Sequence, residues 1–157
     1  MNEIASYLIG KVVDYLPSFI LARLFPPKTI AQQVEIRLRS ETPICITLEA
    51  EVPRIDLYFE ITNLSHVDLV LDRLLIDFWF GQPTFQGAVL KHYAVPSRKS
   101  VNTIRYSQVL TVAQQKQSKQ YIDNSITHGQ ILIYLTAYLE SKVGVIEVQK
   151  NIERSKI

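Results

Sequence analysis

From Val34 onward the chain alternates between apolar and polar residues, and this period of two limits the fold more than any other feature. VEIRLR (34–39) and IDLYFEI (55–61) place Val, Ile, Leu or Phe at every second position, with Glu, Arg, Asp or Tyr between them. Because successive side chains of a strand point to opposite faces, the pattern predicts antiparallel sheets with one buried and one wet face. Seven or eight such short strands predict a mostly β protein, an antiparallel β-sandwich over residues 31–150 with a tail at 151–157.

The other predicted strands are ICITLEA (44–50), LVLDRLLIDFWF (69–80), TFQGAVLKHY (84–93), VNTIRYSQVLTV (101–112) and a terminal hairpin, QILIYLTAYLE (130–140) with VGVIEVQK (143–150). The residues expected to face the core are Val70, Leu74, Ile76, Phe78 and Phe80 in the first long strand, where Asp72 is an exception, and Ile104, Tyr106, Leu110 and Val112 in the next. Trp79 then points outward and needs cover from the N-terminal helix, from residues 113–128 or from a partner. Residues 113–126 lack alternation and predict a short helix. The single Cys45 excludes an intramolecular disulfide, and its strand setting predicts burial.

Residues 1–30 predict a hydrophobic or amphipathic helix that Pro17 kinks or splits into two short pieces and that Pro26-Pro27 ends. Lys11, Asp14 and Arg23 interrupt the apolar residues, which favours a helix at a membrane interface over one that spans the bilayer. Packing against the sandwich or a sister chain is an open alternative. The candidate membrane-contact residues are Leu8, Val12, Leu16, Phe19, Ile20 and Leu24.

Charge is distributed unevenly along the chain. Residues 91–120 carry six Lys or Arg residues and no acid, although the whole chain has a net charge of only +2. This stretch predicts a surface for an anionic partner such as membrane lipid, with Lys91, Arg98 and Lys99 as headgroup candidates. The net charge is too small to indicate nucleic acid.

No motif in the sequence predicts catalysis, a metal site or a cofactor. His66, His92 and His128 lie in separate segments without the spacing of metal ligands, and no Gly-rich phosphate loop is present. His66 and Asp68 lie two positions apart without a nucleophile motif nearby, which makes them a poor catalytic pair.

A polar break, ITNLSHVD (61–68), separates two apolar strands. Asn and Ser bond neighbouring backbone groups and favour turns, so Asn63 and Ser65 are predicted to form a structural turn. Asn63-Leu64-Ser65 is also formally an acceptor for N-glycosylation.

The stretch IDLYFEITNLSHVDLVLDRLLIDFWFGQPTFQG (55–87) resembles the water-stress and hypersensitive-response (WHy) domain of the type-2 late-embryogenesis-abundant proteins, with looser agreement to about residue 150. Leu64 stands where the family usually has Pro. The resemblance implies an immunoglobulin- or fibronectin III-like sandwich, often preceded by a hydrophobic anchor, with a non-enzymatic role in membrane association, stress protection or lipid binding. The expected function is therefore a non-catalytic module held at a membrane. The alternatives are a soluble carrier of lipid or another apolar ligand, and a structural subunit that forms homo-oligomers through its N-terminal helix.

Overall fold

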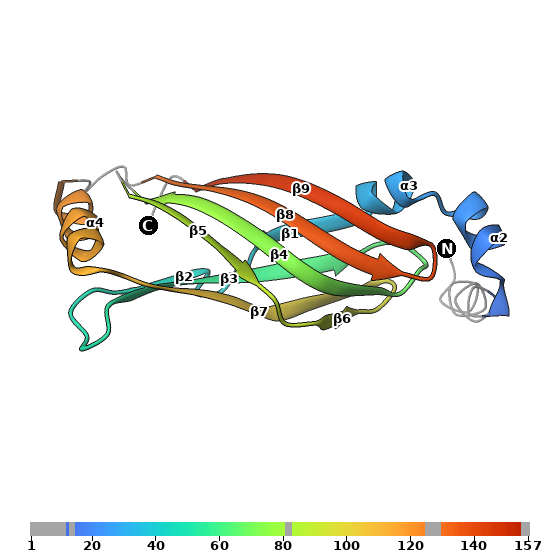
Figure 1. The fold of residues 1–157 in the computed structure, drawn as a ribbon, viewed down its shortest axis with the longest axis horizontal. Helices are drawn as coiled ribbons and strands as arrows, with labels where there is room; N and C mark the ends of the chain where they lie inside the picture. Colours follow the sequence, from blue (N-terminus) through green and yellow to red (C-terminus); the bar gives the residue numbers. More distant parts are fainter. Residues whose placement is uncertain (1–11, 13–14, 81–82, 125–129, 155–157) are drawn as a thin grey trace.

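The computed structural model describes residues 12, 15–80, 83–124 and 130–154. Two antiparallel sheets face each other along an elongated molecule, with short helices at its two ends (Figure 1). The chain is therefore mostly β, and the predicted class of two packed antiparallel sheets is confirmed at that level.

The first sheet is built around β3 (Arg54–Asn63). On one side β3 pairs with β1 (Val34–Leu38) and β2 (Ile44–Thr47), and on the other with β7 (Lys99–Val109). Its inward residues Ile55, Leu57, Phe59 and Ile61 are fully buried, as the alternation predicted.

The second sheet is built around β4 (Leu69–Phe80). β5 (Thr84–Val89) and β6 (Tyr93–Val95) pair along one side of β4, and β8 (Ile131–Ser141) followed by β9 (Gly144–Arg154) lie on the other. Phe78 and Phe85 stack in the core with ring centroids 4.6 Å apart. β9 continues to Arg154, so the predicted tail from residue 151 begins too early.

A β-bulge in β4 explains why Asp72 broke the predicted alternation. The register with β8 shifts between Leu71 and Arg73, which inserts one extra residue. Leu69 and Leu71 therefore face the core before the bulge, while Val70, predicted inside, is 38% exposed. From Leu74 onward the predicted inward set is buried.

The described part of the N-terminal segment is not one continuous helix: Val12 and Tyr15 are helical before Pro17, and two short helices follow it. α2 (Ser18–Leu24) follows Pro17, and α3 (Pro27–Gln32) follows Pro26. Proline fits at these positions because the first residues of a helix need no backbone donor. The predicted boundary at residue 30 falls inside α3, and Leu21 and Ile30 are fully buried in the common core. These helices are thus partly integrated with the sandwich.

A helix covers the opposite end of the sandwich (Figure 1). α4 (Val112–Asn124) lies where the sequence predicted a short helix. The Tyr121 ring meets Phe80 edge-on with centroids 5.3 Å apart, and the Gln115 side chain donates to the Leu48 carbonyl over 2.5 Å. Val112, predicted to face the core, begins this helix and is exposed.

Candidate functional site

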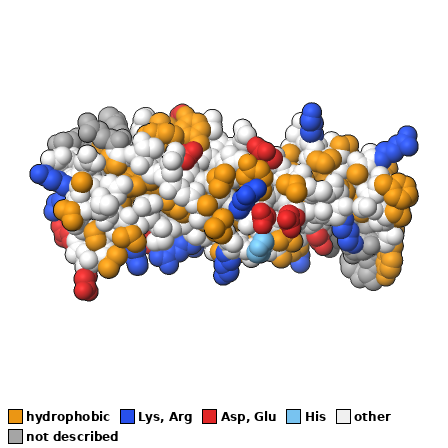
Figure 2. All heavy atoms as spheres, in the orientation of Figure 1, with side chains coloured by type: hydrophobic (Ala, Val, Ile, Leu, Met, Phe, Trp, Pro, Cys, Tyr) orange, Lys and Arg blue, Asp and Glu red, His pale blue; other side chains and the backbone are white. Residues whose placement is uncertain are grey.

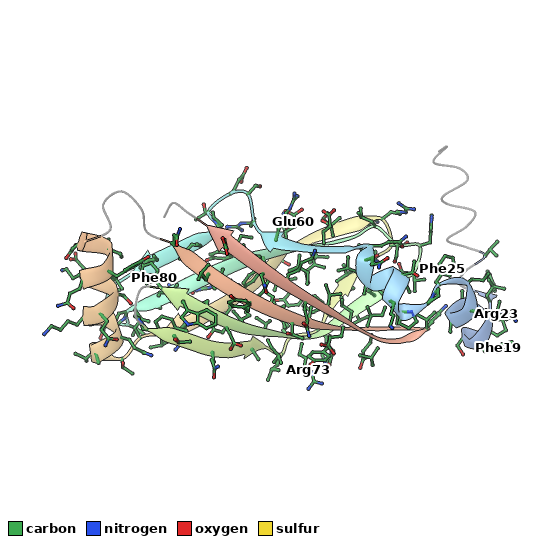
Figure 3. All side chains as sticks on the ribbon, turned by 90° about the horizontal axis from the view of Figure 1, so that it is seen from above. Phe19, Arg23, Phe25, Glu60, Arg73 and Phe80 are labelled. Atoms are coloured by element: carbon green, nitrogen blue, oxygen red, sulfur yellow. The ribbon has the colours of Figure 1, made fainter. Side chains whose placement is uncertain are left out.

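Apolar side chains of the N-terminal segment reach the surface at the α2 end of the molecule. The exposed fraction is 74% for Phe19, 59% for Leu24, 58% for Val12 and 88% for Tyr15. Figure 3 shows Phe19 and Arg23, one helical turn apart, on the side of α2 that points away from the sheets, whereas Phe80 lies near α4. We call these four exposed residues the apolar tip.

The other predicted membrane-contact residues are placed differently. Leu16 is partly buried against the core, and Ile20 is also partly buried. Leu8 lies outside the described residues. Of the predicted residues, the structure therefore exposes Val12, Phe19 and Leu24, together with Tyr15, and turns Leu16 inward.

Buried anchors fix the apolar tip to the sandwich. Leu21 and Ile30 point into the core, and the Phe25 amide donates to the Leu21 carbonyl over 2.7 Å where α2 ends. The carbonyl of Gln33, which follows α3, accepts a bond from the Leu64 amide over 2.8 Å. The helical segment is thus tied to the loop between β3 and β4.

That loop is organised by the buried side chains of Asn63 and Ser65. Oδ1 of Asn63 accepts from the Ser65 amide at 3.0 Å and lies 2.6 Å from its hydroxyl oxygen. Nδ2 donates to the carbonyls of Val67 at 2.8 Å and Val95 at 3.0 Å. One carboxamide therefore joins the end of β3 to β6 in the other sheet. Since Asn63 is fully buried, the folded chain does not present it for glycosylation.

The turn between β6 and β7 lies beside this loop and carries the headgroup candidate Arg98. The Arg98 backbone has φ of 57°, in the left-handed region that non-glycine residues seldom adopt. Asp68 Oδ1 accepts from the Ser97 amide over 2.7 Å, and Nη2 of Arg98 lies 2.7 Å from Nε2 of His66. Burial, and then the Arg98 charge, lower the pKa of His66 below its usual 6.5.

The six bases of residues 91–120 do not form one surface. Arg98 and Lys99 lie at the α2 end, whereas Lys116 and Lys119 belong to α4 at the other end (Figure 1). Lys119 pairs with Glu49 at 3.1 Å. Arg105 is engaged in mid-sheet, and Lys91 precedes β6, with its ammonium 5.3 Å from the Tyr93 ring centroid. The structure separates Lys91 from the Arg98 turn.

Additional bases lie at the α2 end. They are distant in sequence from residues 91–120, so the local charge pattern did not indicate them. Arg23 on α2 and Lys28 on α3 are exposed, and Lys142 lies in the β8–β9 turn. Figure 2 shows hydrophobic atoms at the surface of this end with Lys and Arg nearby. The α2 end therefore combines an apolar tip with basic residues from four separate segments.

A second charged group lies on the outer face of the first sheet, where the sequence had suggested only wet-face residues. The carboxylate of Asp56 is 3% exposed and contacts Arg105 at 2.9 Å and Arg54 at 3.5 Å, while its Oδ1 has no hydrogen-bond partner. The Arg105 and Arg39 guanidinium carbons lie 5.9 Å and 4.5 Å from the Tyr58 ring centroid. These cross-strand contacts give each arginine a partner, so the charged group stabilises the sheet and does not indicate a binding site.

Trp79 and Cys45 differ from expectation in their surroundings. Tyr134 of the neighbouring strand β8 meets Trp79 edge-on, with ring centroids 5.0 Å apart, so this cover comes from the same sheet. Cys45 lies on the short strand β2 and is only partly buried, with Sγ 3.9 Å from Oγ1 of Thr47.

Two kinds of site are absent from the described ranges of the chain. There, no helix is both long and apolar enough to cross a bilayer. Among the same residues, no three His, Cys, Asp or Glu side chains are grouped so that they could hold a metal ion.

No protein-family model matches the sequence, and no curated protein matches it. Solved structures are similar to this chain at low identity. A protein from Archaeoglobus fulgidus covers 79% of this chain over 95% of its own, with 11% identity and a TM-score of 0.45. The solution structure of a candidate late embryogenesis abundant protein covers 99% of this chain over 94% of its own, with 14% identity and a TM-score of 0.38. A transglutaminase from red sea bream covers 80% of this chain over 17% of its own, with 15% identity and a TM-score of 0.35. Similarity at this level does not indicate a ligand or an activity.

Proposed function

We propose that this protein is a non-catalytic, WHy-type β-sandwich that binds anionic membrane surfaces through its α2 end. The observation that carries the proposal is the apolar tip beside exposed bases. In this arrangement Phe19 and Leu24 enter the boundary between headgroups and acyl chains, while α2 lies on the membrane and does not cross it. The immunoglobulin- or fibronectin III-like type of the sandwich is part of the same proposal.

Two physical terms add up in this binding. The apolar tip supplies area that leaves water, at roughly 25 cal/mol for each Å². Arg23, one turn from Phe19, can extend its guanidinium back to the phosphates while its stem stays with the apolar side chains. Arg98 and Lys99 add attraction of about 1 kcal/mol for each base that lies near the anionic surface.

Vesicle flotation tests the two terms separately. Full-length protein is mixed with neutral phosphatidylcholine vesicles, or with vesicles that also contain phosphatidylglycerol, at low and high salt. We expect binding to both, with stronger and salt-sensitive binding to the anionic vesicles. Phe19→Asp should remove most binding to either, whereas Val112→Asp, an equally exposed apolar position on α4, should not.

The charge term has its own matched pair of variants. Arg98→Gln with Lys99→Gln should weaken anionic binding and flatten its salt dependence, with neutral vesicles unaffected. Lys116→Gln with Lys119→Gln removes the same charge from the opposite end and should have little effect. If the native chain floats with neither vesicle type, the membrane proposal is wrong. Self-association through the apolar tip is then tested by sedimentation of the native chain against Phe19→Asp.

A further inference from the structure

His66 and Arg98 meet at the α2 end, across the loops that lead into β4 and β7. Nη2 of Arg98 lies 2.7 Å from Nε2 of His66. A guanidinium has donors and no acceptor, so Arg98 donates and the His66 nitrogen accepts. The imidazole in this contact is therefore neutral and carries its single proton on Nδ1.

The turn that carries Arg98 does not depend on this contact alone. Its backbone is held by the bond from the Ser97 amide to Asp68 and by a bond of 3.3 Å from the Lys99 amide to the Pro96 carbonyl. Loss of the His66 contact therefore releases the Arg98 side chain and leaves the turn in place.

The charged groups around His66 come from several elements. Asp68 lies on the same loop, where its carboxylate is engaged by the Ser97 amide, and Arg98 and Lys99 lie on the facing turn. Lys28 of α3 and Lys142 of the β8–β9 turn are further cations at this end. Glu140 of β8, which lies across from Val70 of β4, is an anion at the same end. The neighbouring Arg98 charge opposes protonation of the ring until an anionic surface approaches.

We infer that His66 strengthens the binding of the α2 end to anionic lipid surfaces in mild acid; this inference rests on the membrane binding proposed above. When the ring gains a proton, Nε2 becomes a donor and the contact with Arg98 is lost. The end then carries one more positive charge, and the Arg98 guanidinium is free to reach a phosphate. One added charge near an anionic surface corresponds to roughly fivefold tighter binding.

The lowered pKa of His66 agrees with a ring that gains its proton only in mild acid. The pKa of the ring is lowered by burial and by Arg98, so the ring is uncharged at neutral pH. A negative surface favours the charged form and raises the pKa again, so proton uptake and lipid binding favour each other.

The experiment measures flotation of the full-length chain with vesicles that contain phosphatidylglycerol, whose charge is the same at pH 7.5 and 5.5. We expect roughly fivefold tighter binding at pH 5.5 for the native chain and for His92→Gln. His66→Gln keeps an acceptor for Arg98 but cannot become charged, so its binding should be the same at both pH values. The His66 ring, followed by NMR without lipid, should titrate below pH 6.5, and at higher pH in Arg98→Gln.

The outcomes separate the two proposals. If the native chain binds equally at both pH values, or if His66→Gln keeps the increase, the inference is overturned and the proposed membrane binding stands. A His66 titration unchanged by Arg98→Gln also overturns the inference. If no variant binds at either pH, membrane binding itself is wrong, and the inference fails with it.

Discussion

Tyr106 of β7 occupies the space above Gly87 of β5: a β-carbon at position 87 would lie 2.5 Å from Cε2 and 2.8 Å from Cζ of the tyrosine. The same ring meets Phe78 edge-on at 6.0 Å, and its hydroxyl donates to Oε1 of Gln108 over 2.6 Å. Gly87 thus allows the two sheets to approach where β5 faces β7.

Gly87→Ala should lower the free energy of unfolding by about 1–3 kcal/mol, because the ring must move from a packed position. Chemical denaturation measures this change. Tyr106→Phe removes the hydroxyl that crowds position 87, so the double variant should lose less than the sum of the single losses. Strict additivity would show that the ring and position 87 do not interact.

Asn63→Ala should destabilise the fold by more than the removal of an exposed side-chain amide does. It removes the side-chain donor to the Val95 carbonyl and the acceptor of the Ser65 amide, at a cost of about 1–3 kcal/mol for each buried group left unpaired. The Val67 carbonyl keeps its bond from the Ser65 hydroxyl. Asn102→Ala, at an exposed position of β7, is the control and should change stability by less than about 0.5 kcal/mol. Equal effects of the two changes in thermal or urea unfolding would contradict the role given to Asn63.

Two arginines of the first sheet should contribute differently to the free energy of unfolding. Arg105→Ala leaves the buried carboxylate of Asp56 with only Arg54 at 3.5 Å, so we expect a loss of about 1.5–3 kcal/mol. Arg37→Ala removes a 2.9 Å pair with Glu60 in which the arginine is mostly exposed and screened by solvent, so it should destabilise the fold less than Arg105→Ala does. Urea unfolding of both variants in one buffer gives the comparison, and a reversed order would be inconsistent with the burial of Asp56.

Truncation should separate the apolar tip from the core. A chain that begins at Pro17 keeps the buried residues Leu21 and Ile30, and we expect a cooperative melt. A chain that begins at Gln33 loses both and exposes the core residues beneath them, so its melting temperature should fall. Circular dichroism follows the two melts, and equal melting temperatures would mean that α2 and α3 contribute nothing to stability.

Alternation along the chain was sufficient to predict most strands and to assign their side chains to the buried or the solvent-exposed face. The inward faces of β1 and β3 follow directly from the period of two. Val70 was placed on the wrong face because the bulge at Asp72 depends on the register between β4 and β8, which a local pattern does not contain. Val112 was misplaced for a similar reason, since apolar residues can continue past the point where a strand becomes a helix.

The candidate site could be predicted only in part. The apolar character of Phe19 and Leu24 was readable from the sequence, but the burial of Leu21 required knowledge of the packing of α2 on the sandwich. The contact between His66 and Arg98 joins residues 32 positions apart, and nothing in either local segment predicts it. Side chains from α2, α3 and two distant turns lie at one end of the molecule because the strands next to these segments end there.

The central position of β3 and β4 has a consequence for the rate of folding. Each of these strands pairs with segments that are distant in sequence, as Asp56 does with Arg105, 49 positions away. Long loops must close before such contacts form, and proteins dominated by distant strand pairing fold over milliseconds to seconds. During that interval the apolar faces of β3 and β4, joined by the short Asn63 loop, lack the strands that later cover their edges. Cells that make this chain quickly therefore face their greatest risk of aggregation before β7 and β8 have been added.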